Sequence, residues 1–207
     1  MKKPTSVRSL EEFGRIQLSP NFFMRDFLFS EIAAIPGLPN IPDDPDLAVA
    51  AGRRLCEELL EPLQAMFGRI AIRSAYRSPA VNAVGNKKSP NCGSNESNFA
   101  GHIWDRRDAE GCMGAEACIV IPWFLPHYNK TRDWRPLAWW IHDHLPYSYM
   151  EFFPKLCAFN LAWREKPHRE ILSYIPPHKG FLTRPGMPNH TGRHSQWYKG
   201  FPKRVTA

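Results

Sequence analysis

The stretch "RIAIRSAYRSPAVNAVG", residues 69–85, contains the change from strand to helix that organises the first half of the chain. Residues 69–76 alternate between apolar and polar side chains, which is the pattern of a half-buried β-strand. Ser78 and Pro79 are typical of a helix start, and Gly85 is typical of a helix end. The stretch therefore predicts a strand, a tight turn and a short helix in immediate succession.

A long amphipathic helix is expected before this strand. Asp44 is a good capping residue, and Pro45 fits the first helical position because the N–H that it lacks would have no partner there. The helix is predicted from Asp46 to Phe67, with a kink at Pro62. Its apolar stripe, which should pack across one face of a sheet, consists of Leu47, Ala51, Leu55, Leu59, Leu63 and Met66.

Most of the other strands are expected later in the chain. Apolar or alternating runs predict strands of one mainly antiparallel sheet at 69–76, 117–121, 149–153, 157–163 and 169–175. The last two should form a β-hairpin, because only a short polar stretch separates them. Early helices and late strands together predict an α+β fold, with a small antiparallel sheet and helices packed on one of its faces.

The composition restricts the class of protein. Hydrophobic residues make up 43% of the 207 residues, which indicates a folded chain rather than a disordered one. Five cysteines without a close pair argue against a disulfide framework. No apolar run reaches the length of a membrane-spanning helix, and no apolar stretch follows the two lysines at the start. We therefore expect no membrane span and a chain that is cytoplasmic as synthesised.

The positive charge is concentrated at the C-terminal end. The net charge of +7 favours anionic partners. We expect an N-terminal extension at 1–17, one domain at 18–175 and an irregular, basic tail at 176–207. The aromatic residues of the tail could bind carbohydrate or single-stranded nucleic acid, although packing onto the domain is the simpler interpretation. The tail has no acidic residue, and its basic residues are Lys179, Arg184, Arg193, Lys199, Lys203 and Arg204.

Three short motifs resemble those of a known enzyme family. They are "LSPNFFMRDFLFS", "SAYRSPAVNAVG" and "GAEACIVIP", and their order along the chain is that of the zinc D-Ala-D-Ala carboxypeptidase-like peptidases, family M15. The resemblance covers about Leu18 to Ile175 in element order. It implies the Hedgehog/DD-peptidase fold, a zinc cofactor, and hydrolysis of peptidoglycan stem peptides by a D,D-carboxypeptidase or endopeptidase, as in phage lysins. Such an enzyme would act on the cell wall after release from the cytoplasm.

The family's metal motif, Ser-x-His-x-x-Gly-x-Ala-x-Asp, fits this chain in more than one register. With "GAEACIVIP" as its end, Cys118 stands where the family has Asp, and the His would fall near Gly111. With "GHIWD" as its end, Asp105 restores the Asp, but Asn98 stands at the His position. A third register keeps His102 as the ligand and treats the following residues as an insertion. The ligand candidates are therefore His102, Cys118 and Asp105.

The resemblance also assigns roles outside the metal motif. "YMEFF" offers Glu151 as the catalytic acid or base, whereas "AFNLAW" puts Asn160 where the last family His is expected. Arg77 and Ser74 match positions that bind substrate, and a guanidinium suits a substrate carboxylate. The matched order of motifs predicts that Arg77, His102, Cys118, Glu151 and Asn160 line one cleft.

Other histidines and other functions also fit the sequence. His142 or His144 of "HDH", or a histidine of the tail, would complete a zinc site only if the fold brought it near, and "HDH" more often marks a helix C-terminus. Cys118, between apolar residues, fits an inert buried thiol better than a ligand. The chain would then be either a peptidase with an altered ligand set or a non-catalytic module that binds wall peptide or another partner. Nucleic-acid binding through the tail is a third, weaker interpretation.

Overall fold

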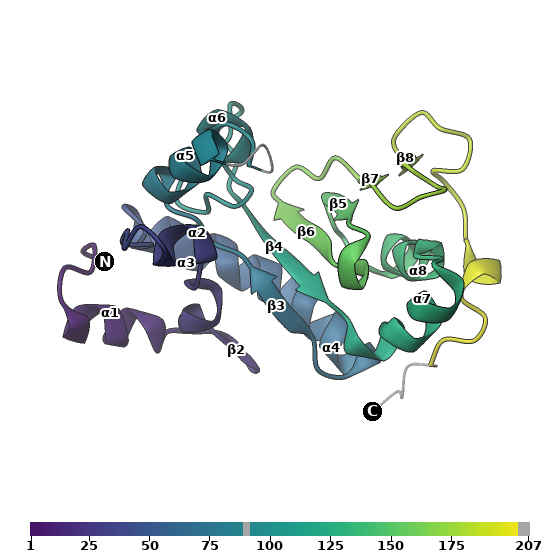
Figure 1. Ribbon diagram of the computed structural model, residues 1–207, viewed down its shortest axis with the longest axis horizontal. Coiled ribbons are helices and arrows are strands. Elements are labelled where there is room, and N and C mark those ends of the chain that lie inside the picture. The colour runs from purple at the N-terminus through teal and green to yellow at the C-terminus, as the bar shows by residue number, and fades with distance from the viewer. Residues whose placement is uncertain (89–91, 203–207) are drawn as a thin grey trace.

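The computed structural model describes residues 1–88 and 92–202 and has an α+β architecture around a six-stranded sheet (Figure 1). The strand order is β3-β4-β6-β5-β7-β8. Neighbours are antiparallel except β5 and β7, which run parallel. The strands are β3 (Ala71–Ser74), β4 (Gly114–Val120), β5 (Tyr149–Phe152), β6 (Phe159–Arg164), β7 (Glu170–Ser173) and β8 (Gly180–Thr183), and a separate two-stranded sheet joins β1 (Gln17–Ser19) to β2 (Phe22–Phe23).

The sheet confirms the predicted strands but corrects two expectations. The predicted hairpin between the last two strands is wrong, because β5 lies between β6 and β7. A short turn at Lys155–Cys157 folds β6 back onto β5 instead, which leaves the other edge of β5 free to pair with β7. The tail is also less irregular than expected, since β8 extends the sheet beyond residue 175.

One long helical segment covers a face of the sheet, as predicted. It consists of α3 (Pro45–Leu55), a π-helical turn (Cys56–Leu60) and α4 (Glu61–Phe67), and Figure 1 shows α3 and α4 running behind β3 and β4. The π-helical turn, which is wider than an α-helical turn, ends two residues before Pro62. Pro62 has no N–H with which to form a regular helical hydrogen bond. Ala51, Leu55, Leu59 and Leu63 are fully buried against the sheet, and each buried leucine contributes about 2–3 kcal/mol of transfer free energy.

The remaining helices lie around the sheet. Phe13 of the N-terminal extension is buried in the main core, so this segment packs onto the domain. None of the helices in the described parts of the chain is both long and apolar enough to cross a membrane. The remaining helices are α1 (Val7–Gly14), α2 (Glu31–Ala34), α5 (Pro79–Lys88), α6 (Asn95–Asn98), α7 (Leu125–Thr131) and α8 (Arg135–His144).

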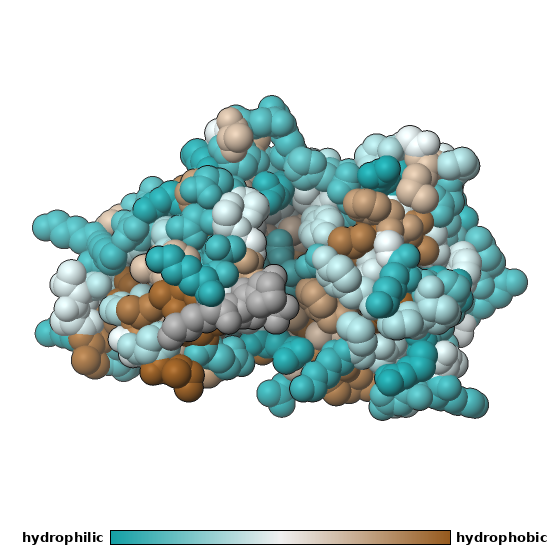
Figure 2. Space-filling view, turned by 45° about the horizontal axis from the view of Figure 1, so that its top comes forward, coloured by the Kyte–Doolittle hydropathy of each residue, from teal (hydrophilic) through white to brown (hydrophobic). Residues whose placement is uncertain are grey.

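The tail packs back onto the domain, in agreement with the simpler interpretation of its aromatic residues. Tyr198 and Phe201 contact the hydrophobic core, and the short helical turn Ser195–Trp197 lies beside α8. Lys203 and Arg204 lie outside the described residues. Figure 2 shows one face of the molecule, which is covered mostly by hydrophilic residues.

Candidate functional site

Polar side chains form two rows across the face of the sheet that is turned away from α3. Residues paired directly across neighbouring strands point to the same face. The register pairs Ser74 with Cys118, Cys118 with Asn160, and Asn160 with Glu151, which makes one row over four strands. Glu116 and Tyr149 are both paired with Ala162 in the adjacent row.

These rows form the floor of a cleft with a volume of about 1070 Å³, here called the sheet cleft. The sequence prediction of one shared cleft is confirmed for all five residues. The residues that line the sheet cleft include Ser74, Arg77, His102, Glu116, Cys118, Tyr149, Glu151, Asn160, Arg164, Glu170 and Tyr174.

His102 is held against the end of β3 by two hydrogen bonds. Its Nδ1 lies 2.7 Å from the Ala75 carbonyl oxygen, and its own carbonyl accepts from the Arg77 N–H at 2.8 Å. The loop that carries it also approaches β4 closely. A Cβ atom at Gly114 would lie only 2.3 Å from the Ala100 carbonyl oxygen, so this contact requires glycine. His102 is therefore positioned by backbone contacts from both sides.

The second nitrogen of His102 faces a carboxylate. Nε2 lies 3.1 Å from Oε1 of Glu116, and both side chains are largely buried. Because a carbonyl can only accept, Nδ1 carries a hydrogen, and the Nε2 lone pair of a neutral ring would face the carboxylate. The contact is stabilised either by a second proton on the ring or by a cation shared between the two groups.

Glu116 is the functional candidate that sequence reasoning missed. It stands where the family motif has Ala, two residues before the position where the motif has Asp. The available signal was the period of two along a strand, which places Glu116 and Cys118 on the same face. Burial alone would raise the pKa of the Glu116 carboxyl, but His102, together with Arg77 and Arg164, holds this pKa below its ordinary value. Glu116 is therefore ionised at neutral pH.

Glu151 lies at the far end of the first row. Its carboxylate accepts hydrogen bonds from the Tyr149 hydroxyl at 3.3 Å and from the Asn160 amide at 3.2 Å. Burial and the negative charge of Glu116 raise the pKa of Glu151. Two carboxyl groups with pKa values shifted in opposite directions are typical of sites that transfer protons.

Arg77 contributes a positive charge to the same cleft. Its side chain is largely buried, and Nη1 donates to Cys92 Sγ at 2.8 Å. Its Nε has no hydrogen-bond partner among the described residues. Because Arg77 lines the sheet cleft, its guanidinium is suited to binding an anionic group of a ligand.

Cys118 and Asp105 lie in different surroundings. Cys118 lines the sheet cleft, and burial raises the pKa of its thiol to about 11, so the thiol keeps its proton at neutral pH unless a bound cation displaces it. Asp105 lies outside the residues that line the sheet cleft. It is almost fully buried elsewhere, where it accepts from the Asp43 N–H at 2.7 Å and pairs with Arg106. Asp105 thus fixes the segment before α3.

The "HDH" histidines do not reach the sheet cleft either. They end α8, as the alternative interpretation expected. His142, Asp143 and His194 offer ligand atoms within 4.8 Å of one another, and among the described residues this is the one such group of three. Its atoms already have partners: His142 contacts the Tyr147 hydroxyl and the His190 carbonyl, and His194 contacts Asp143 and the Asn189 carbonyl. The group ties the tail to α8.

His102 and Glu116 supply two of the three protein ligands that a catalytic zinc site has. Imidazole nitrogen and carboxylate oxygen are both zinc ligands, and two donors on one tetrahedral zinc at about 2.0–2.1 Å lie about 3.3 Å apart. The observed separation of 3.1 Å between His102 Nε2 and Glu116 Oε1 is close to that value. The His102 N–H that contacts a backbone carbonyl is the usual support for a metal-binding histidine.

Comparisons with protein-family models, with curated proteins and with solved structures give no match for this chain. The resemblance to the M15 peptidases therefore rests on the short sequence motifs alone.

Proposed function

We propose that the chain is an M15-like, zinc-dependent peptidase with a changed ligand set, acting on peptidoglycan stem peptides. The observation that carries this proposal is the His102–Glu116 pair, whose second imidazole nitrogen faces an ionised carboxylate inside a large polar cleft. His102 keeps its place as a ligand, and Glu116 takes the place of Cys118 and Asp105. No third protein ligand is assigned.

Each residue then has a defined task. His102 and Glu116 would hold zinc, which when bound acts as a Lewis acid and lowers the pKa of bound water. Glu151 takes a proton from the attacking water and returns it to the leaving amine, for which its raised pKa is suitable. The Asn160 amide and the Tyr149 hydroxyl hold the Glu151 carboxylate in position.

Arg77 supplies recognition in this proposal. Its guanidinium, which lines the sheet cleft, would bind a carboxylate of the peptide substrate. Ser74 stands in the same row as Cys118 and Asn160 and adds a hydroxyl to the cleft floor. A stem peptide, which carries free carboxylates, matches these groups.

The experiment is elemental analysis of zinc combined with a peptidase assay. Purified wild-type protein should contain about one zinc per chain, and His102→Ala and Glu116→Gln should each lose it together with stem-peptide hydrolysis. Cys118→Ser, a change in the same strand as Glu116, is the matched control and should keep both the bound zinc and the hydrolysis of stem peptide. Zinc lost from Cys118→Ser but kept in Glu116→Gln would contradict the ligand set.

A second candidate is a non-catalytic module that binds wall peptide in the same cleft. The observation in its favour is Asn160, which stands where the family has its last histidine and is already bonded to Glu151. A folded wild-type protein without zinc that still binds stem peptide, and loses this binding in Arg77→Ala, would favour the module over the peptidase.

A further inference from the structure

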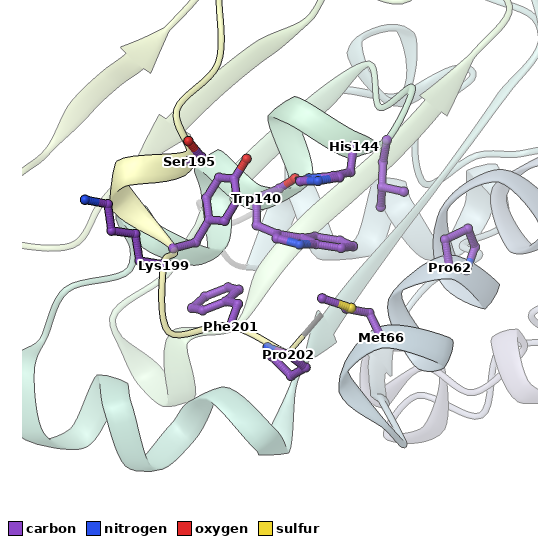
Figure 3. A pocket seen from close by; sticks show the side chains of 10 residues that line it. Pro62, Met66, Trp140, His144, Ser195, Lys199, Phe201 and Pro202 are labelled. Carbon is purple, nitrogen blue, oxygen red and sulfur yellow. The ribbon is translucent and has the colours of Figure 1, made fainter. Parts of the chain in front are cut away.

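A second cavity, of about 440 Å³, lies on another side of the domain, between α4, α8 and the tail (Figure 3). Pro62 and Met66 come from α4, and Trp140 and His144 come from α8. The tail supplies the remaining wall between Ser195 and Pro202. None of the residues that line this cavity lines the sheet cleft. The two hollows are therefore separate.

The wall supplied by the tail is fixed by specific contacts. Asp143 accepts hydrogen bonds from the His194 backbone N–H at 2.6 Å, from the His194 ring at 2.7 Å and from the Tyr198 hydroxyl at 2.7 Å. The His194 ring stacks on Trp139 with 3.8 Å between the ring centroids. Phe201 packs edge-on against Phe67 at 5.6 Å. The cavity is thus a built feature of the fold.

The interior of the cavity is apolar, and one lysine, Lys199, stands at its rim. Met66, Trp140 and Phe201 face the interior, whereas the ammonium end of Lys199 points outward (Figure 3). Lys199 forms no ion pair among the described residues, and residues 176–207 contain no acidic side chain. The neighbouring acid, Asp143, is already bonded to His194 and Tyr198.

We propose that this cavity binds a small amphipathic anion. The volume lies within the range of about 300–1000 Å³ that is typical of small-molecule sites. A flat apolar ring would enter between Met66, Trp140 and Phe201, whose surfaces favour aromatic packing. The anionic head would stay at the rim and pair with Lys199, whose hydrocarbon stem lines the cavity while its charge remains in water. The net charge of +7 favours the approach of such a ligand.

The test uses 8-anilino-1-naphthalenesulfonate, which has flat rings and one anionic group. Its fluorescence on titration with wild-type protein should show saturable binding of one molecule per chain. Lys199→Glu should weaken binding at least fivefold, whereas Lys179→Glu, the matched change elsewhere in the tail, should leave it unchanged. Ser195→Trp should fill the mouth of the cavity and abolish binding. Thermal melting of each variant identifies any that fails to fold.

Two further measurements distinguish binding in this cavity from binding in the sheet cleft. Probe binding should be unchanged in His102→Ala, and the uncharged analogue N-phenyl-1-naphthylamine should bind more weakly than the sulfonate. Binding lost in His102→Ala but kept in a folded Ser195→Trp would move the site to the sheet cleft and overturn the proposal. Equal binding of the uncharged analogue, insensitive to Lys199→Glu, would overturn the role of the anionic head.

Discussion

Two histidine–carboxylate pairs in this molecule look alike but differ in what surrounds them. His102 and His194 each turn one ring nitrogen toward a backbone carbonyl and the other toward a carboxylate. In the tail pair, Asp143 lies 2.7 Å from the His194 ring and also accepts from a backbone N–H and from Tyr198. In the sheet cleft, Glu116 lies 3.1 Å from His102.

The two pairs differ in how many of their hydrogen-bonding atoms already have partners within the protein. The tail pair is saturated by its own chain, so it serves to hold a segment in place. The cleft pair is longer, lies in a large polar cleft, and is near a second carboxylate, Glu151, whose pKa is raised by burial and by the charge of Glu116. The negative charge of Glu116 beside the His102 ring is balanced either by a second proton on the ring or by a bound cation. Surroundings, rather than residue types, separate a structural pair from a candidate catalytic one.

Replacement of Glu151 should have a stronger effect than any other change described below. Glu151→Gln should lower kcat for stem-peptide hydrolysis by about 10³-fold, because loss of a general base typically costs 10²–10⁴-fold. Zinc content should stay at the wild-type level, since Glu151 is assigned no ligand role. Glu170→Gln, which changes another glutamate of the same cleft, is the matched control and should have a much smaller effect. Equal losses in both variants would contradict the assignment of Glu151.

The next effect concerns the loop that positions His102. Gly114→Ala should reduce the free energy of unfolding by about 3 kcal/mol. The new Cβ would overlap the Ala100 carbonyl oxygen and would force the loop that carries His102 away from β4. Denaturant unfolding measures this loss. Gly37→Ser is a control without close neighbours in space, although its positive φ adds a small strain of its own. A Gly114→Ala variant as stable as wild type would show that the loop does not need this contact.

A smaller effect tests the tail pair. His194→Ala should lower the free energy of unfolding by about 2 kcal/mol, since it removes a charge-assisted hydrogen bond and the stacking on Trp139. The zinc content should not change, because the tail pair is assigned no metal. Zinc lost from a folded His194→Ala protein would reverse the roles of the two pairs.

The smallest effect uses Glu61, a carboxylate satisfied entirely by its own chain. It accepts from the Ser19 hydroxyl at 2.6 Å and from the Asn21 backbone and side chain at 2.8 and 2.7 Å. Burial opposes ionisation, but these bonds hold the pKa of Glu61 below its ordinary value of 4.5. The stabilisation is therefore complete above about pH 4.5 and is lost as the pH falls through the lower, folded-state pKa.

Glu61→Gln should accordingly cost about 1 kcal/mol at pH 7 and progressively less at acid pH. Urea unfolding at several pH values measures the difference. Glu57→Gln, an exposed change in the same helical segment, should have almost no effect at any pH. A cost for Glu61→Gln that grows as the pH falls would contradict the sign of this linkage.

Much of the fold followed from sequence periodicity, whereas the pairing of strands did not. The stripe from Leu47 to Met66 determined the long helix, and alternation determined β3 and β5. The position of β5 between β6 and β7 depends on long-range pairing, which local pattern does not encode. At the site, motif order brought Arg77, His102 and Glu151 together correctly. Glu116 was missed because the family motif has Ala at its position. Asp105 was assigned a ligand role because a loop sequence does not show which of its side chains are buried away from the cleft.

Anomalous diffraction at the zinc edge, from crystals grown with zinc, would show where the metal binds. We expect one strong peak in the sheet cleft, within bonding distance of His102 Nε2 and the Glu116 carboxylate, with the tail pair of His194 and Asp143 still in direct contact. A peak at His142, Asp143 and His194 with none in the sheet cleft, or no peak at all with His102 and Glu116 in direct contact, would contradict it.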